Sequence, residues 1–255
     1  MQVCLGDIIP TSTLEWPGKV SLVVFFRGCP FKCPYCSNAK FIEPGEPVEI
    51  ERVTGEISRA KDFIDAVVIS GGEPFMQQVA FHEIARHARS LGLKVGAQTN
   101  GMYPDRISAA VGLGLLDAVM LDVKAPLELN AYSRAAGDRG RKDILDAVTR
   151  TVALCNKLRA DGKLAYYEVR TTVFQGFSDS PAEVAAIAAA VRCDAYVIQQ
   201  GRPEIAMDDS VKRLAAIPRN DLISLARHVR QNVSVDDVKA VKVRTREMGD
   251  EVIKP

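Results

Sequence analysis

Short apolar runs alternate along the chain with longer segments whose apolar residues recur every three or four positions. The short runs are rich in β-branched and aromatic residues and predict buried strands; they cover residues 20–26, 66–70, 95–100, 117–121, 166–173 and 195–200. The longer segments predict helices; they cover residues 50–64, 79–91, 104–113, 143–160, 181–191 and 221–231. A final strand is predicted over residues 238–246.

The predicted strands are almost continuously apolar, which is typical of parallel strands covered by helices. Six β-α units are enough for an open, partial barrel but fewer than the eight of a closed barrel. The sequence therefore predicts an α/β fold, a partial (β/α)6 barrel with parallel strands and outer helices. We expect one domain over residues 1–255, with an N-terminal segment at 1–19, the barrel at 20–203, and a helix and a strand at 204–255.

Charge and composition narrow the classes of partner. Lys and Arg number 33 against 32 acidic residues, so the formal net charge is +1 and gives no reason to expect binding to nucleic acid or to a membrane surface. No stretch reaches the ~18 consecutive apolar residues of a membrane span. The first ten residues lack the basic and apolar regions of a secretory signal.

Three cysteines, Cys29, Cys33 and Cys36, lie on one short segment with the spacing C-x3-C-x2-C. Three thiolates so placed can ligate three irons of a cubane cluster and leave the fourth iron open to a substrate or cofactor. A structural zinc site is the alternative, but such sites are usually closed by four ligands. No His or Cys follows at zinc-finger spacing. The pattern therefore favours one 4Fe-4S cluster, and zinc stays the competing interpretation.

The other three cysteines, Cys4, Cys155 and Cys193, are scattered along the chain. Their spacing does not resemble a disulfide framework, so we expect core or surface thiols and a reducing, cytoplasmic compartment. They do not form a second cysteine set, so we expect no auxiliary cluster.

Polar residues and glycines follow the predicted strands at the positions where parallel α/β folds place their chemistry. The cysteine segment follows the first strand, Gly71 and Gly72 follow the second, and Asp122 and Lys124 follow the fourth. Because glycine has no Cβ, Gly71 and Gly72 would let the backbone approach a ligand closely. An ordinary strand-to-helix turn is the alternative.

The cysteine spacing and the turn Gly71-Gly72-Glu73-Pro74, in this order and each after a strand, resemble the radical S-adenosylmethionine (radical SAM) superfamily. The resemblance implies that S-adenosyl-L-methionine chelates the open iron. One electron from the cluster then gives methionine and a 5′-deoxyadenosyl radical, which abstracts hydrogen from the substrate. It also implies that strand-end carbonyls and Glu73 accept hydrogen bonds from the cofactor's ammonium.

Three further residues have implied roles in cofactor binding. The family places an aromatic residue against the adenine at the position of Tyr35; loop packing is the alternative. Asp122 and Lys124 share one face of a strand end, and in glycyl-radical-enzyme activases such a pair holds the cofactor's ribose and carboxylate. A surface salt bridge is the alternative interpretation.

Arg170 is a charge within the fifth predicted strand, where it should face the barrel interior. A buried Arg needs an anionic partner, and the cofactor's carboxylate and an internal carboxylate are equal candidates. Gln199 and Gln200 end the sixth strand and could line the same pocket.

The segments 11–19 and 25–29 resemble the activating enzymes of glycyl radical proteins, most closely the branch that activates anaerobic ribonucleoside-triphosphate reductase. The similarity is strongest over residues 11–126 and weaker in 170–173 and 198–203. It implies a protein substrate, from which the radical takes the pro-S hydrogen of a glycine Cα. It also implies a low-potential electron donor such as flavodoxin or ferredoxin.

One residue departs from this pattern. Gln98 stands where several activases carry an acidic residue that helps to bind the cofactor and, in some members, a monovalent cation. A neutral amide would weaken such a cation site, so we do not predict one. A radical enzyme acting on a small molecule, a tRNA base or another protein remains a rival hypothesis, as does a zinc-binding module. An electron-transfer protein is a weaker rival, because such proteins usually ligate every iron.

Overall fold

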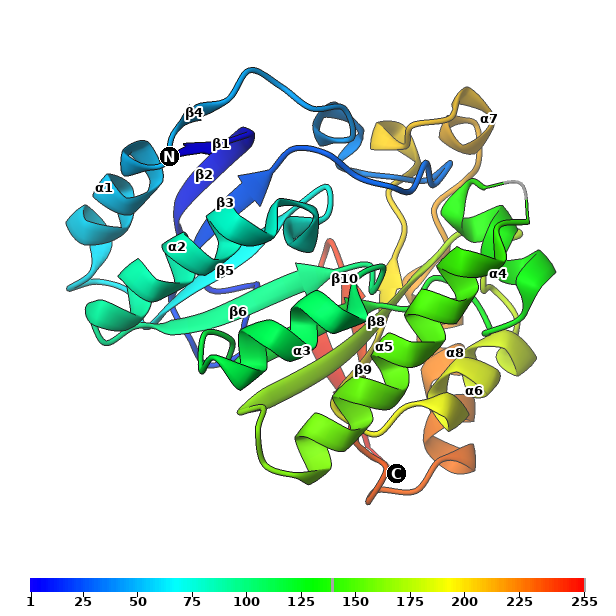
Figure 1. Ribbon diagram of the computed structural model, residues 1–255. Helices are drawn as coiled ribbons and strands as arrows, with labels where there is room; N and C mark the ends of the chain where they lie inside the picture. The colour runs from blue at the N-terminus through cyan, green and yellow to red at the C-terminus, as the bar shows by residue number, and fades with distance from the viewer. Residues whose placement is uncertain (139, 255) are drawn as a thin grey trace.

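The computed structural model of the protein describes residues 1–138 and 140–254. Its main feature is a nine-stranded sheet in the order β11-β10-β9-β8-β7-β6-β5-β3-β2 (Figure 1). The strands are β2 (Leu5–Ser12), β3 (Ser21–Phe26), β5 (Ala66–Gly71), β6 (Lys94–Thr99), β7 (Ala118–Asp122), β8 (Tyr166–Val173), β9 (Cys193–Gln200), β10 (Val238–Thr245) and β11 (Gly249–Ile253). A small second sheet pairs β1 (Gln2–Val3) with β4 (Val48–Glu49).

Within the nine-stranded sheet, the strands from β3 to β10 all pair in parallel, which confirms the predicted α/β fold. The sheet continues beyond the six strands of the predicted barrel, because β10 pairs in parallel with β9. Antiparallel strands β2 and β11 form the two edges. The sequence pattern missed β2, since it contains Gly6 and Pro10 and most of its residues are exposed or half-buried. The predicted boundary after residue 203, between the barrel and the C-terminal segment, is not tested by the structure and stays a prediction.

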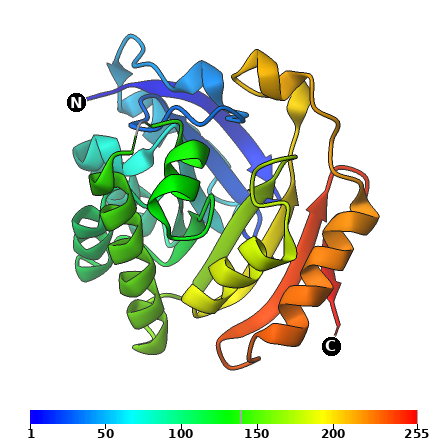
Figure 2. The same cartoon turned by 90° about the vertical axis from the view of Figure 1, so that its right-hand side faces the viewer.

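Helices cover the convex face of the curved sheet (Figure 2). Six of them match the predicted helices: α1 (Glu51–Ala60), α2 (Gln78–Ser90), α3 (Pro104–Gly112), α5 (Lys142–Ala160), α6 (Pro181–Ala190) and α8 (Arg219–Asn232). The short elements were not predicted: α4 (Leu129–Ala136), α7 (Asp209–Lys212), and the 3-10 turns η1 (Ala39–Phe41), η2 (Pro74–Gln77) and η3 (Pro203–Ile205). Within the described ranges, no helix has the length and apolar character needed to cross a membrane.

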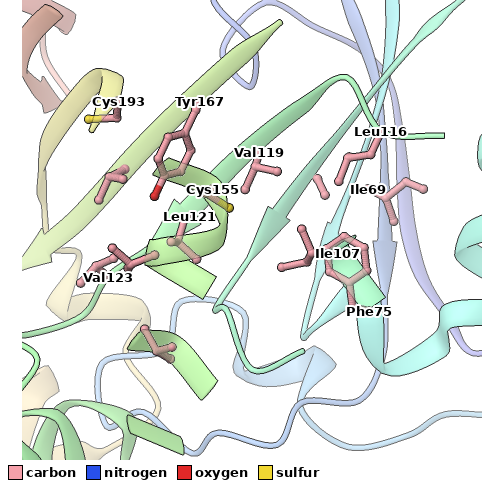
Figure 3. Packing of buried hydrophobic residues seen from close by; sticks show 14 of the residues in the cluster. Ile69, Phe75, Ile107, Leu116, Val119, Leu121, Val123, Cys155, Tyr167 and Cys193 are labelled. Carbon is pink, nitrogen blue, oxygen red and sulfur yellow. The ribbon is translucent and has the colours of Figure 1, made fainter. Parts of the chain in front are cut away.

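The main hydrophobic core lies between the sheet and these helices. Figure 3 shows its packing around Val119, Leu121 and Tyr167. Cys155 and Cys193 are fully buried in this core as free thiols, in agreement with the expected core cysteines.

A second, smaller cluster covers the concave face of the sheet. The Trp16 side chain, which is 4% exposed, packs there with Ala66, Val68, Ala118 and Met120. Gly96 leaves room for the indole, since a Cβ at this position would lie 3.2 Å from Trp16 Cε3. The loop between β2 and β3 therefore folds back into the barrel and closes its interior from the side opposite the strand ends.

Gly71 and Gly72 set the position of the cysteine loop, which we define as residues 28–36. Both positions need glycine for backbone packing, and the approach of a ligand to them stays a prediction. A Cβ on Gly71, whose φ is +115°, would lie 2.1 Å from the Phe26 carbonyl oxygen, and one on Gly72 would lie 2.2 Å from the Gly28 carbonyl oxygen. Only glycine fits this crossing of two backbones.

The Trp16 contact gives a first testable prediction. Trp16→Ala should lower the free energy of unfolding by about 3–5 kcal/mol, because it empties the centre of the concave-face cluster. Urea denaturation followed by circular dichroism measures this. Leu14→Ala is the control, since Leu14 is 71% exposed in the same loop and should change stability by less than about 0.5 kcal/mol. Equal losses in both variants would contradict the packing described.

Gly72→Ala should destabilise the protein by at least about 2 kcal/mol, because the added methyl group meets backbone that cannot rotate aside. Gly112→Ala is the matched control: a Cβ at Gly112 meets nothing within 4 Å, so this variant should be neutral or slightly stabilising. Thermal unfolding of the two variants compares them. A Gly72→Ala protein as stable as Gly112→Ala would show that the two backbones do not approach as described.

Candidate active site

A polar cleft of about 1000 Å³, counting space open to solvent, lies at the carboxyl ends of the parallel strands. Side chains from consecutive strands, all on the same face of the sheet, line this cleft. Its lining includes Cys29, Cys33, Tyr35, Cys36, Ser70, Gly71, Gly72, Gln98, Asn100, Asp122, Lys124, Arg170, Thr172, Gln199, Gln200 and Arg202. All the predicted site residues except Glu73 therefore meet at one place.

The cysteine loop is fixed by backbone hydrogen bonds to segments distant in sequence. These bonds run from Gly28 N–H to Phe41 C=O (2.9 Å), Cys29 N–H to Ile42 C=O (3.0 Å), Lys32 N–H to Ala136 C=O (3.0 Å), Asp208 N–H to Pro34 C=O (2.8 Å) and Glu73 N–H to Gly28 C=O (2.8 Å). They reach η1, α4, the start of α7 and the turn after β5. The loop is therefore held on several sides by the protein itself.

The end of α4 presses directly on this loop. Gly137 ends the helix with φ +70°, and a Cβ there would lie 1.8 Å from the Lys32 carbonyl oxygen. A side chain at this position would push the loop away, so the left-handed helix end and the loop need the same glycine.

The three cysteines differ in their surroundings. Burial raises the pKa of the Cys29 thiol to about 12 and of the Cys33 thiol to about 11, and it also raises the pKa of Cys36. The backbone N–H groups of Phe31 and Asn38 offset part of this rise in pKa at Cys29 and Cys36. Ligation by a metal would therefore have to displace protons from these thiols.

The arrangement also bears on the choice between zinc and a cluster. Across residues 1–138 and 140–254, no three His, Cys, Asp or Glu side chains are placed to hold one metal ion. Ligands of a single zinc ion lie about 2.0–2.3 Å from it and so must crowd together, whereas the cysteines of a cubane cluster bind different irons. All three cysteines line one open cleft, which has room for a group larger than a single ion.

Glu73 is the one predicted site residue that does not line the cleft. Its carboxylate is 0% exposed and accepts hydrogen bonds from Phe75 N–H (3.1 Å), Thr99 Oγ1 (2.8 Å) and Asn100 N–H (2.8 Å). Burial raises the pKa of Glu73 to about 7, since these bonds offset only part of the desolvation. The Glu73 side chain thus ties the turn after β5 to the turn after β6. Its predicted contact with the cofactor's ammonium stays a prediction.

Asp122 and Lys124 lie together at the end of β7, as predicted. Lys124 Nζ is 3.7 Å from Asp122 Oδ2, and both side chains line the cleft. Burial alone would lower the pKa of Lys124, but Cys33 and Asp122 raise it well above its usual value. The ammonium therefore stays charged beside the cysteine loop.

Tyr35 lines the cleft, but its ring is largely covered by protein. The ring stacks on Phe174 with centroids 5.0 Å apart and meets the edge of Phe177 at 5.1 Å. Its hydroxyl is buried without a partner among the described residues. Loop packing, the alternative to adenine binding, therefore accounts for the ring, and a role of Tyr35 in base binding stays a prediction.

Arg170 has the internal carboxylate partner that was one of its two candidates. Its side chain is 7% exposed, its Nε donates to Glu168 Oε1, and its Nη2 donates to the Glu15 carbonyl at 3.0 Å. Burial alone would raise the pKa of Glu168, but Arg170 and Arg244 lower it. Arg170 also lines the cleft, so a bound carboxylate can still meet its guanidinium edge.

Gln98 is engaged at both ends of its amide. It accepts a hydrogen bond from Ser70 Oγ (2.7 Å) and donates to the Glu15 carboxylate. Gln199 and Gln200 also line the cleft; the Gln200 amide donates to the Ile217 carbonyl (3.0 Å), whereas Gln199 faces Thr172 across the strand register.

Sequence reasoning assigned no site role to several lining residues, among them Ser70, Asn100, Thr172 and Arg202. Strand alternation could have found Thr172, which shares a face with Arg170 two residues earlier. No comparable signal indicates Glu15, because its place depends on a loop that folds back into the barrel.

The residues present fit a cluster and S-adenosyl-L-methionine. Three thiols on a fixed loop face a cleft with a cationic side, formed by Lys124 and Arg170, and an acidic group, Asp122. Cationic side chains suit a carboxylate, and a carboxylate suits ribose hydroxyls or an ammonium.

Comparison with known proteins places the chain in a family. Residues 23–186 match the model of the Radical SAM superfamily. A Methanocaldococcus jannaschii protein, provisionally named a glycyl-radical enzyme activating enzyme, is 34% identical over 229 residues, which cover 89% of this chain and 92% of that protein. A 7-carboxy-7-deazaguanine synthase from Hyperthermus butylicus is 37% identical over 89 residues, which cover 34% of this chain and 37% of that protein.

A solved radical SAM methyltransferase from Sphaerobacter thermophilus has the same fold. Its TM-score is 0.67 at 14% identity, with coverage of 90% of this chain and 67% of that one. Family membership implies a 4Fe-4S cluster and S-adenosyl-L-methionine as cofactors. The pattern of cysteines, the cleft at the strand ends and these similarities lead to one assignment: the chain belongs to the radical SAM superfamily of enzymes.

Proposed function

We propose that the protein is a glycyl-radical-enzyme activating enzyme, which abstracts a hydrogen atom from a glycine of a partner enzyme. One observation carries the proposal: the similarity to the M. jannaschii protein extends over nine-tenths of both chains. The similarity to the deazaguanine synthase, in contrast, covers about a third.

The cleft offers a distinct position for each part of the cofactors. Cys29, Cys33 and Cys36 would ligate three irons of the cluster and leave the fourth for S-adenosyl-L-methionine. Lys124 and Arg170 would meet the carboxylate of the methionine part. Asp122 would accept hydrogen bonds from the ribose, and the Gly71 and Gly72 backbone from the ammonium.

When bound and reduced, the cluster supplies the electron that cleaves S-adenosyl-L-methionine to methionine and a 5′-deoxyadenosyl radical. The protein's part is to bind, orient and exclude water. The glycines and Glu73 hold the cysteine loop against the end of β5, so the three thiols and the strand-end groups keep a fixed separation. Tyr35 and Phe174 close one side of the cleft with apolar surface.

The proposed partner is an anaerobic ribonucleoside-triphosphate reductase, on the strength of the sequence resemblance over residues 11–126. The proposed electron source is a low-potential protein such as flavodoxin or ferredoxin. A reducing compartment such as the cytoplasm suits the cysteines, all of which are free thiols in the structure.

A second candidate function is a radical SAM reaction on a small molecule, favoured by the similarity to the deazaguanine synthase. Both functions share the cluster and the cofactor, so cofactor cleavage alone does not separate them. The identity of the radical product does.

The cluster assignment gives the next prediction. The protein, reconstituted anaerobically with iron and sulfide and then reduced, should convert S-adenosyl-L-methionine to 5′-deoxyadenosine. Replacing any one of Cys29, Cys33 and Cys36 by Ala should reduce this at least about 100-fold and remove most of the iron, since each thiolate is a ligand. Cys4→Ala is the control and should retain activity. Wild-type rates in a loop variant would contradict the assignment.

The substrate assignment is tested in the same mixture with an anaerobic ribonucleotide reductase added. Activation should produce the doublet signal of a glycyl radical in electron paramagnetic resonance, and the doublet should collapse when the partner's glycine is deuterated at Cα. Cofactor cleavage without a protein radical, for every glycyl radical enzyme tried, would overturn the activase proposal and favour a small-molecule substrate.

A further inference from the structure

Asn100 brings a polar side chain to one of the cysteines of the loop. It follows β6 directly, is 5% exposed, and its Nδ2 lies 3.5 Å from Cys29 Sγ, within hydrogen-bonding distance for sulfur. Among the described residues, no other side chain donates a hydrogen bond to a sulfur of this loop.

The orientation of the Asn100 amide is fixed by its other bonds. Its Oδ1 accepts a hydrogen bond from Met102 N–H (3.0 Å), so its nitrogen has to face the sulfur. Its backbone N–H donates to Glu73 (2.8 Å).

The rest of the turn is equally constrained. Thr99 Oγ1 donates to Glu73 and accepts from Gly101 N–H (3.1 Å), and Thr151 Oγ1 donates to the Gly101 carbonyl (2.7 Å). The turn is therefore rigid, and the position of the donor does not depend on a bound ligand.

We propose that Asn100 is a positioning residue that donates a hydrogen bond to the Cys29 thiolate of the cluster and thereby raises the cluster's reduction potential. Reduction adds one electron to the cluster and moves no heavy atom. A donor aimed at a ligating sulfur stabilises the more negative, reduced state more than the oxidised state. Asn100 would therefore make the cluster easier to reduce. The cost would be a smaller driving force for electron transfer from the reduced cluster to S-adenosyl-L-methionine.

The proposal concerns the cluster and not the substrate. It holds for either candidate function, so its failure and the failure of the activase proposal are separate results. A buried amide that bonds a ligand sulfur acts on the metal through the ligand, as other outer groups of metal sites do.

The test is an anaerobic redox titration of the reconstituted protein without S-adenosyl-L-methionine, followed by the paramagnetic signal of the reduced cluster. Asn100→Ser keeps an oxygen that can accept from Met102 N–H but cannot reach the sulfur. We expect its ratio of reduced to oxidised cluster at fixed potential to fall about threefold to tenfold, in keeping with one hydrogen bond. A tenfold fall corresponds to a shift of about −59 mV.

Asn100→Asp keeps the acceptor for Met102 and places an oxygen where the donor was, so it should lower the potential further. Thr151→Val is the matched control: it removes a buried hydrogen bond to the same turn without touching the sulfur, and it should leave the potential unchanged. Resonance Raman spectra should show stronger iron–sulfur bonds in the Asn100 variants only.

Three results would overturn the proposal. One is an unchanged potential in Asn100→Ser with an intact cluster. Another is an equal shift in Thr151→Val, which would make the effect structural. The third is failure of both Asn100 variants to retain iron while they stay folded, which would assign Asn100 to cluster retention instead of tuning.

Discussion

The close crossing of two backbones, between the exit of β3 and the end of β5, is the constraint on which the site depends. Gly72 N–H donates to the Phe26 carbonyl (2.9 Å), Glu73 N–H donates to the Gly28 carbonyl (2.8 Å), and neither Gly71 nor Gly72 has room for a Cβ. The crossing sets the distance between the cysteine loop and the strand-end groups. A cofactor that must reach both at once needs that distance to be fixed.

Glu73 extends this constraint to a third strand. Its buried carboxylate ties the turn after β5 to Thr99 and Asn100 after β6, so the ends of three strands are linked. Some charged groups support the cleft without facing it, and others face it directly. Glu73 and Glu168 are fully buried and occupied by protein partners, whereas Asp122, Lys124 and Gln199 line the open space.

The sequence predicted the general location of the site because two simple rules were enough. Hydrophobic periodicity located the parallel strands, and the carboxyl ends of such strands meet at one edge, so the cysteine loop, Asp122, Lys124 and Arg170 had to come together. The role of Glu73 could not be predicted, since it depends on which way one side chain turns after a tight bend. The partner of Arg170 could have been predicted, because Glu168 lies two residues away on the same strand and therefore on the same face.

The sequence did not predict where loops lie when they pack against distant parts of the chain. Trp16 and Glu15 enter the barrel from a loop between antiparallel and parallel strands, and no periodicity indicates that path. The short helices α4 and α7 were missed for a related reason: with eight and four residues they carry too little pattern, yet both hold the cysteine loop through backbone bonds.

The measurement that most directly tests this account is hydrogen–deuterium exchange of the metal-free protein, resolved to single amides. Backbone hydrogen bonds to distant segments should build the cysteine loop before any cluster is present. The amides of Gly28, Cys29 and Lys32, each bonded to a distant carbonyl, should then exchange far more slowly than in an unstructured peptide. Exchange of these amides at the unstructured rate, with protection only after cluster assembly, would show that the cluster organises the loop and would contradict the account.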